Sequence, residues 1–333
     1  MVYHRGIRSG CLQQPAAQAA SGSTRLQSCE VHVDRVTMVD GTCTDDPVES
    51  MKDVSMKTVM IQQTVIERLV DEYPVLYLDP DTTPQSEYRR VFLRGEEPAQ
   101  KSLSHYQGDN ADRMESVMTP EGAVLVVTLG NRRDFELILR GLMAVKNGPL
   151  DQIPQSQGAA MLTVFNWPRI LAHLALYPAN ERNAEFQRFT LVKENYMDML
   201  VVLSRGPYSN VSAAQMGCTQ EDWMNLSDTI RRYHELTHVI CRRRCPKKAD
   251  PVRDELIADA VGLYAAYGFF DPEMEKLFLG IQGETYTGGR LENYTDKPGQ
   301  ITPAICRELV SMKQKIVRCK ASDPFELIPV LIN

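Results

Sequence analysis

Two histidines one helical turn apart, with a glutamate directly after the first, are the clearest candidates for chemistry in this 333-residue chain. His234, Glu235 and His238 form an H-E-x-x-H motif. On a helix, residues four positions apart project from the same face, so the two histidines could bind one tetrahedral zinc ion together. Glu235 is rotated from His234 by about 100°, where it can take a proton from water activated by the ion. The motif therefore predicts a zinc site that performs hydrolysis.

A zinc site of this kind needs a third protein ligand. Position 244, where an extended H-E-x-x-H-x-x-G-x-x-H motif has its third histidine, is Arg244, which excludes that class. Glu255 follows His238 by 255 − 238 = 17 residues, enough for the chain to turn and return as an antiparallel helix. Asp259 lies four residues further, on the same helix face. We expect Glu255 to complete a His₂Glu site, Asp259 to orient a ligand histidine, and Gly262 to let the two helices approach closely.

These residues resemble the gluzincin metallopeptidases, the thermolysin-like class in which H-E-x-x-H is followed by a helix carrying E-x-x-x-D. The matching runs are HELTH at 234–238 and DELIAD at 254–259, and the resemblance covers roughly residues 228–264. It implies a zincin-like fold, one zinc ion per chain and a peptide or protein substrate. It also implies the role of each matching residue: His234, His238 and Glu255 as zinc ligands, Glu235 as general base, and Asp259 as the carboxylate that orients a histidine.

A zinc hydrolase usually also has a side chain that donates a hydrogen bond to the oxyanion formed during the reaction. Candidates lie in segment 286–294, a glycine-containing stretch after the predicted zinc helices that could form a loop over a cleft. Within it we select Tyr286 and Arg290 as possible donors. For His173, which follows a predicted strand, a core or surface role is expected instead.

The motif residues require helices, and the sequence predicts helical structure from residue 219 almost to the C-terminus. Thr219 and Asp222 have capping-box-like spacing, which begins a helix that contains residues 222–244. Gly268 is a plausible end of the next helix. Three pairs that join a capping residue to a proline predict further helix starts: Asp250-Pro251, Asp271-Pro272 and Thr302-Pro303.

The N-terminal half mixes short strands with helices. Apolar periodicity predicts helices at 54–72, at 131–146 after an Asn131 start, and at 168–176. Residues 80–121 are mostly polar and predict loops with one short strand. The predicted strands are Val75–Leu78, Val91–Leu93, Ala123–Leu129, Ala160–Phe165 and Met197–Leu203. We expect residues 199–203 of the last strand to lie at a sheet edge, where an extended peptide could add as another strand.

Together these elements predict an α+β fold of zincin-like character. Residues 51–333 would form one catalytic domain, with a mixed α/β part and a small sheet at 51–205 and a mainly helical part at 206–333 that carries the metal site. Residues 1–50 are expected to be a disordered or targeting leader, because residues 1–29 contain Arg, Ser and Ala but no Asp or Glu. The expected location is the cytoplasm, or an organelle if residues 1–29 are a transit peptide.

The composition is that of a globular protein. With 37 Lys+Arg against 43 Asp+Glu, the net charge is −6, and without a long basic block this argues against a nucleic-acid partner. No apolar run approaches the roughly 18 residues that a membrane span needs. The eight cysteines are too widely spaced for a disulfide framework, and Cys241 and Cys245 have no second close pair for a four-ligand zinc site.

The sequence thus predicts a zinc-dependent hydrolase, with a metallopeptidase as the first choice. Two alternatives stay open. One is a noncatalytic, metal-stabilised binding or regulatory protein that retains the zincin scaffold, and the other is a zinc amidase that acts on a nonpeptide substrate. A di-iron site would need a second E-x-x-H motif, and no histidine other than His238 follows a glutamate by three positions.

Overall fold

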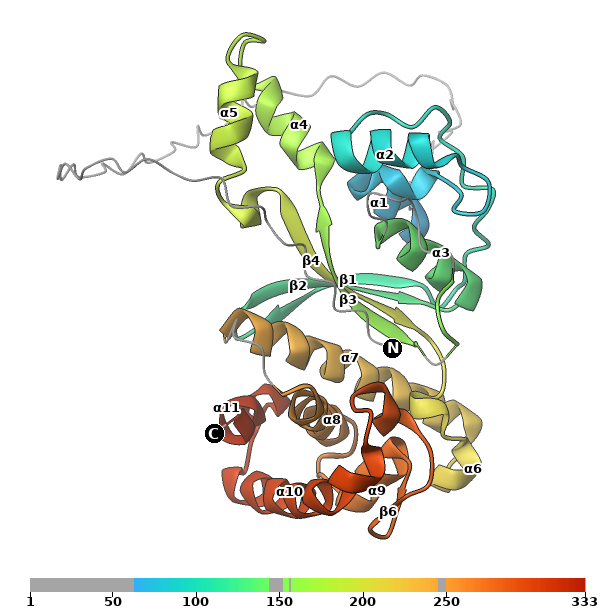
Figure 1. Cartoon of the computed structure of the whole chain (residues 1–333). Helices are drawn as coiled ribbons and strands as arrows, with labels where there is room; N and C mark the ends of the chain where they lie inside the picture. Colours follow the sequence, from blue (N-terminus) through green and yellow to red (C-terminus); the bar gives the residue numbers. More distant parts are fainter. Residues whose placement is uncertain (1–62, 144–151, 156, 245–249, 333) are drawn as a thin grey trace, which may run out of the picture. The chain divides into compact units, whose positions relative to one another are not determined.

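A mixed four-stranded sheet organises the computed structural model, which describes residues 63–143, 152–155, 157–244 and 250–332 (Figure 1). The strands are β1 (Arg113–Thr119), β2 (Gly122–Leu129), β3 (Ala159–Phe165) and β4 (Met197–Ser204), in the order β1-β2-β4-β3. The β1–β2 and β3–β4 pairs are antiparallel, and β2 and β4 are parallel. Because β4 is paired on both sides, the prediction that residues 199–203 lie at a sheet edge is wrong.

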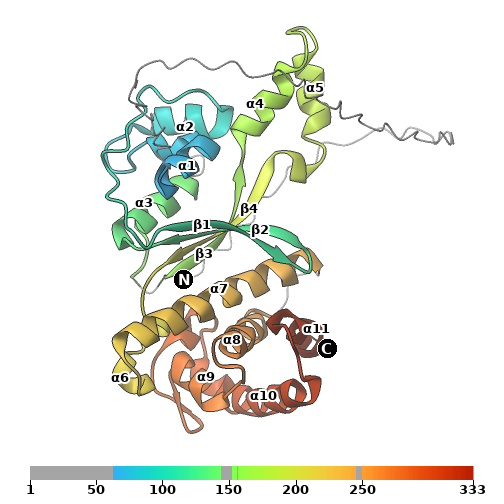
Figure 2. The same cartoon turned by 180° about the vertical axis from the view of Figure 1, so that it is seen from behind.

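The continuous apolar run of β4 reflects burial on both faces of the sheet. Val201 and Leu203 belong to a hydrophobic cluster on one face, whereas Leu200 and Val202 belong to a cluster on the other. Helix α7 (Gln220–Arg244) contacts β3 and β4 on the first face, and α3 (Arg132–Leu142) contacts the sheet on the second. The two views in Figures 1 and 2 show α7 and α3 on opposite sides of the strands.

The second face is covered by the N-terminal helices. These are α1 (Val65–Glu72), the 3₁₀ turn η1 (Pro74–Tyr77), α2 (Gln85–Arg94) and α3, with α4 (Trp167–Ala175), α5 (Arg182–Phe189) and η2 (Lys193–Asn195) following β3. The side chain of Asn131 accepts hydrogen bonds from the backbone N–H groups of Arg133 and Asp134, so the predicted start of α3 is confirmed. The predicted positions of β2, β3, β4 and α4 are also confirmed within one or two residues. Residues 54–62 of the first predicted helix lie outside the described residues, as do the predicted leader and residues 144–146.

Three predictions in the N-terminal half are wrong. Residues 75–78 form the turn η1 and its end instead of a strand, because Pro74 stands at the first helical position and lacks a ladder donor. Residues 91–93 lie in α2, whose buried Tyr88 and Val91 fall three apart as on a helix. Strand β1 falls in a region predicted as loop, since its polar residues are held by pairing with β2 rather than by burial.

The C-terminal half is nearly all helical, as predicted. It contains η3 (Tyr208–Asn210), α6 (Ala213–Met216), α7, α8 (Pro251–Tyr267), α9 (Pro272–Leu279), a small hairpin of β5 (Ile281–Gln282) and β6 (Thr285–Tyr286), η4 (Arg290–Asn293), α10 (Pro298–Cys319), η5 (Pro324–Glu326) and α11 (Leu327–Ile332). The side chains of Asp250 and Asp271 cap α8 and α9, and Gly268 ends α8 in a left-handed conformation. The predicted start at Thr302-Pro303 is wrong, because α10 already begins at Pro298 and includes Pro303.

The described chain is therefore an α+β protein. All of its described residues from Gln63 onward belong to one structural unit. None of the helices in the described ranges combines the length and the apolar character that a membrane span requires.

Close packing of α7 against α8 is the feature that positions the predicted zinc ligands. Gly262 of α8 lies directly against the backbone of α7 at Ile230, and an added Cβ would be 2.6 Å from the Ile230 carbonyl oxygen. Any larger residue would force the two helices apart, so the expectation that Gly262 allows a close approach is confirmed.

Replacing Gly262 by alanine is expected to lower the free energy of unfolding by about 1–3 kcal/mol, because the new methyl group has no space. Urea unfolding monitored by circular dichroism measures this change. The control is Gly299→Ala in α10, where an added Cβ has no neighbour within 4 Å and the free energy should be kept or slightly raised. Equal unfolding free energies for Gly262→Ala and the parent would contradict the close approach.

Candidate metal centre

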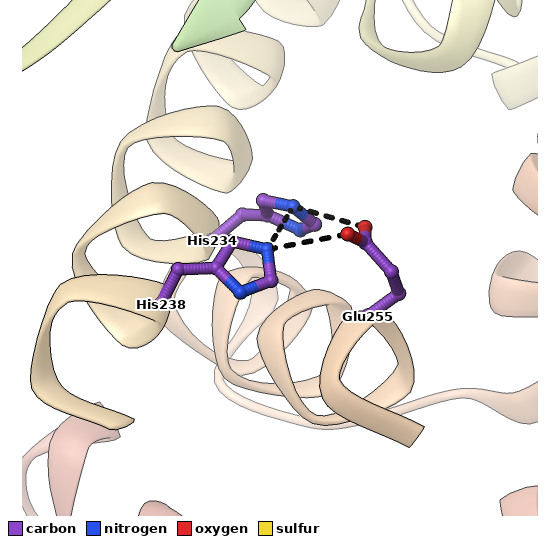
Figure 3. Close-up of side chains that lie close together, drawn as sticks. All are labelled: His234, His238 and Glu255. Atoms are coloured by element: carbon purple, nitrogen blue, oxygen red, sulfur yellow. Dashed lines mark hydrogen bonds and ion pairs between the residues drawn. The ribbon is translucent and has the colours of Figure 1, made fainter. Parts of the chain in front are cut away.

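Three side chains from α7 and α8 point toward one another in the space between the helices (Figure 3). The Nε2 atoms of His234 and His238 are 3.1 Å apart. The two carboxylate oxygens of Glu255 lie 3.4 Å from Nε2 of His234 and 3.5 Å from Nε2 of His238. Within the described part of the chain, these residues form a group of three that could share one metal ion. The structure thus brings together the three residues predicted as ligands.

These spacings fit a tetrahedral zinc ion. Bonds of about 2.05 Å that meet near the tetrahedral angle place ligand atoms about 3.3 Å apart. The observed separations of 3.1 Å between the two nitrogens, and of 3.4 and 3.5 Å from these nitrogens to the two oxygens of Glu255, lie near that value. Two imidazole nitrogens and one carboxylate are also the donor set of catalytic zinc sites, which keep a fourth position for water or substrate.

The outer nitrogen of each histidine contacts a carboxylate. Nδ1 of His234 is 2.6 Å from Oδ1 of Asp259, and Nδ1 of His238 is 2.9 Å from Oδ2 of Asp254. An ionised carboxylate can only accept, so each imidazole donates from Nδ1 and turns the lone pair of Nε2 inward. Two inward lone pairs 3.1 Å apart are favourable only with a positive charge near them, which Glu255 alone does not supply. The protonation pattern therefore suits a cation in this space.

The electrostatic environment of the ligands is consistent with this pattern. Burial alone would raise the pKa of Glu255, but the neighbouring His238 and His234 outweigh it and lower that pKa well below its ordinary value. For His238, burial lowers the pKa, but the carboxylates of Glu255 and Asp254 raise it above its ordinary value. A positive charge in the cluster, carried by a proton on His238 or by a metal ion in its place, is therefore stabilised by these carboxylates.

A buried network lies behind His234. Asp259 is completely buried and accepts hydrogen bonds from His234 and from the hydroxyl of Tyr208, and it forms an ion pair with Arg290. Arg290 also donates from Nη1 to the Tyr208 hydroxyl over 2.8 Å. The predicted orienting role of Asp259 therefore has a structural counterpart, and Arg290 contacts this network.

A family model described as a family of unknown function, DUF7005, matches residues 69–322. The chain belongs to this family. The matched region contains the whole cluster, but the family description names no activity for it. No curated protein and no solved structure matches the chain.

Glu235 lies beside the cluster of this DUF7005 chain without joining it. It is partly exposed, and no hydrogen bond or ion pair to the described residues holds its carboxylate. Its position directly after His234 on α7 places it on the adjoining helix face, as the motif predicts. A carboxylate that is close to the ligands but not engaged is suited to transfer protons.

The two predicted donors have different surroundings. Arg290 reaches the site, but its contacts are with Tyr208 and Asp259 behind the ligand His234. Tyr286 does not contact the cluster, because its hydroxyl bonds to Gly289 and Glu292 within its own loop. His173 lies elsewhere, beside Glu185 and stacked on Phe189.

Three residues at the site were not selected from the sequence, although one of them, Tyr294, lies in the candidate segment 286–294. Tyr294 lies close to Glu255 and Glu235. Burial contributes most to the raised pKa of its hydroxyl, and the negative charges of these two glutamates raise it further. Asp254 contacts His238 and stands directly before Glu255, so the acidic pair could have suggested it. Tyr208 lies in η3 and is separated from His234 by 26 residues, with no signal in its neighbours.

A further carboxyl group is buried nearby. Glu275 of α9 is completely buried, and neither of its oxygens has a hydrogen-bond partner among the described residues. Burial, and secondarily the negative charge of Glu255, raises its pKa well above the ordinary value. Glu275 is therefore protonated in the folded chain at pH values where it ionises in the unfolded chain.

Glu275→Gln is expected to stabilise the fold increasingly as the pH rises from 4 to 8. Between the unfolded and the folded pKa, the folded parent binds one proton more than the unfolded parent, so its stability falls with rising pH. Urea unfolding at several pH values, in the presence of a chelator, measures the difference. Glu273→Gln, an exposed change on the same helix, should leave the pH dependence unchanged. A stability difference for Glu275→Gln that does not vary with pH would rule out this protonation state.

Glu255→Ala is expected to weaken zinc binding more than 100-fold, because a lost ligand should cost more than the 10–100-fold typical of an outer residue. The parent should bind one zinc ion per chain. Competition with a chromophoric chelator measures both values. Glu308→Ala, a change of a partly exposed glutamate on α10, serves as the control and should bind zinc like the parent. Unchanged affinity in Glu255→Ala would remove Glu255 from the ligand set.

Proposed function

We propose that this chain is a zinc-dependent hydrolase of gluzincin type that cleaves a peptide or amide bond, with a peptide or protein as substrate. The observation that supports the proposal most is the spacing of His234, His238 and Glu255, which fits one tetrahedral zinc ion. Outer carboxylates on both histidines and the unengaged Glu235 complete the set of groups that hydrolysis requires.

His234, His238 and Glu255 would hold the ion. When bound, zinc supplies Lewis-acid chemistry, since it polarises a carbonyl group and lowers the pKa of water to about 7. Asp259 and Asp254 hold the two imidazoles with Nε2 directed inward. The protein thereby presents an ordered ligand set before any substrate binds.

Glu235 is the proposed general base. Its carboxylate accepts the proton of the attacking water and later passes this proton to the leaving amine. Its lack of hydrogen bonds to the described residues leaves both oxygens available for this transfer.

Tyr294 is the proposed hydrogen-bond donor to the developing oxyanion. Its proximity to Glu255 and Glu235 supports this role, as does its raised pKa, which keeps the hydroxyl proton in place. Arg290 contributes positive charge from behind His234, and Tyr286 is the least supported of the three because its hydroxyl bonds within its own loop.

The overall fold also supports the proposal, but less specifically than the geometry of the cluster does. The ligands come from two closely packed helices that follow a small mixed sheet, an arrangement that agrees with a zincin-like architecture. The zincin assignment itself rests on the motif residues and on the cluster geometry.

Glu235→Gln is expected to retain zinc and to lose turnover by about 10²–10⁴-fold, because the amide cannot accept a proton. Metal analysis and chelator-sensitive cleavage of a peptide library test both parts together. The control is Glu221→Gln, an exposed change in the first turn of the same helix that should leave cleavage unchanged. Turnover at the parent rate in Glu235→Gln would disprove the mechanism. A parent that binds zinc but cleaves no peptide or amide would favour the noncatalytic alternative.

A further inference from the structure

The surroundings of Asp259 contain more charged and polar groups than orientation of one histidine requires. Its carboxylate is completely buried, and a buried charge is costly unless it is paired and hydrogen-bonded. Three groups face it: the Nδ1 atom of His234, the hydroxyl of Tyr208 and the guanidinium of Arg290. Arg290 balances the negative charge, which leaves Asp259 ionised and able to accept.

The protons in this network have one consistent arrangement. Arg290 can only donate, so the Tyr208 oxygen accepts from it over 2.8 Å. The Tyr208 proton is then directed to Asp259, as is the proton on Nδ1 of His234. Although the Tyr208 oxygen lies 3.0 Å from Nδ1 of His234, both groups donate to the same carboxylate and not to each other. This arrangement fixes His234 as the tautomer whose Nε2 faces the cluster.

The backbone around Tyr208 is shaped to hold this side chain. Ser209 and Asn210 follow with φ values of 50° and 58°, a left-handed conformation that is uncommon for residues other than glycine. The Tyr208 N–H donates to the buried hydroxyl of Ser227 over 3.0 Å. Phe278 packs edge-on against the Tyr208 ring, with the ring centroids 5.2 Å apart. The phenol therefore has one fixed position.

Arg290 is placed by a tight contact between glycines. A Cβ on Gly280 would collide with the carbonyl oxygen of Gly288, and Thr287 donates its N–H to Gly280 over 2.8 Å. The chain between them is the β5–β6 hairpin, and η4 begins with Arg290 directly after it. The guanidinium carbon of Arg290 lies over the Tyr208 ring, 5.1 Å from its centroid, so the two side chains also make a cation–π contact.

We infer that Tyr208 and Arg290 are positioning residues for the metal site, acting on the ligand His234 through the carboxylate of Asp259. The inference rests on the proposed zinc site but does not require hydrolytic activity. It assigns to η3 and η4, two segments that supply no proposed ligand, an influence on metal affinity through Asp259.

Zinc affinity of the full chain tests the inference. Tyr208→Phe and Arg290→Met should each raise the zinc dissociation constant about 10–100-fold, the range typical of outer residues. Arg290→Lys keeps a positive charge beside Asp259 and should recover part of the lost affinity. The matched control is Tyr88→Phe, in which a buried phenol also loses one hydrogen bond, to the Leu78 carbonyl, on the other face of the sheet. It should bind zinc like the parent.

Two further readouts separate positioning from a general loss of structure. In the cobalt-substituted protein, Tyr208→Phe should shift the visible absorption bands, whereas Tyr88→Phe should not. In an Asp259→Asn background, adding Tyr208→Phe should change the zinc dissociation constant less than about 2-fold, because the route through Asp259 is already lost. Circular dichroism confirms that each variant is folded.

The outcomes are distinguishable. Folded Tyr208→Phe and Arg290→Met proteins that bind zinc as tightly as the parent would overturn the inference and leave the zinc site intact. Full additivity of Tyr208→Phe with Asp259→Asn would also overturn it, since Tyr208 would then act by another route. A parent that binds no zinc would overturn the proposed function and the inference with it.

Discussion

The contact between α7 and α8 at Gly262 is the constraint on which the rest of the structure depends. Helix α7 supplies both histidines and α8 supplies Glu255, so the two Nε2 atoms and the two carboxylate oxygens reach their 3.1–3.5 Å spacing only if the helix backbones nearly touch. The sheet supports this contact, because buried residues of β4 pack against α7. Helix α7 also donates to the sheet through Arg243, whose guanidinium bonds to carbonyl groups of the β1–β2 turn and β2. The hydrophobic core and these polar anchors therefore fix the position of α7, against which α8 packs.

The features best predicted from the sequence are those that depend on residues only a few positions apart in the chain. The helices that carry the site have side-chain caps, proline at the first helical position or glycine at the end, and all of these act within a few residues of the chain. The ligands were predictable for the same reason, since His234 and His238 share one helix face and Glu255 follows on the next helix. Strand β1 and turn η1 were not predictable from the sequence, because tertiary contacts override their weak local preferences. Strand β1 is held by its partner strand, and η1 packs its apolar side chains against α1 and α3.

Tyr208 shows a different limit of sequence reasoning. Nothing in its neighbours indicates a role, because its partners are 26, 51 and 82 residues further along the chain. Arg290 was selected from the sequence for its charge and its place in a glycine-containing loop, and the structure puts it behind His234, where it pairs with Asp259. A sequence can indicate that a positive side chain belongs near an acidic cluster. The partner of that side chain can be identified only when the path of the loop is known. Here this path depends on the close approach of Gly280 to Gly288.

The charges around the cluster form a graded arrangement that would favour a cation in the shared space. Closest to the shared space lie two neutral imidazole nitrogens and one carboxylate, and one layer further out lie Asp254 and Asp259, which make those nitrogens better donors to a metal. Without a metal ion, the carboxylates of Asp254, Glu255 and Asp259 would give the site excess negative charge, and Arg290 compensates for the carboxylate of Asp259. The remaining negative charge is what a divalent ion neutralises. Glu275 has no cation beside it. Burial therefore keeps its carboxyl group protonated, and it adds no charge to the site. The arrangement of charged and neutral carboxyl groups is thus the one expected around a proposed cation site.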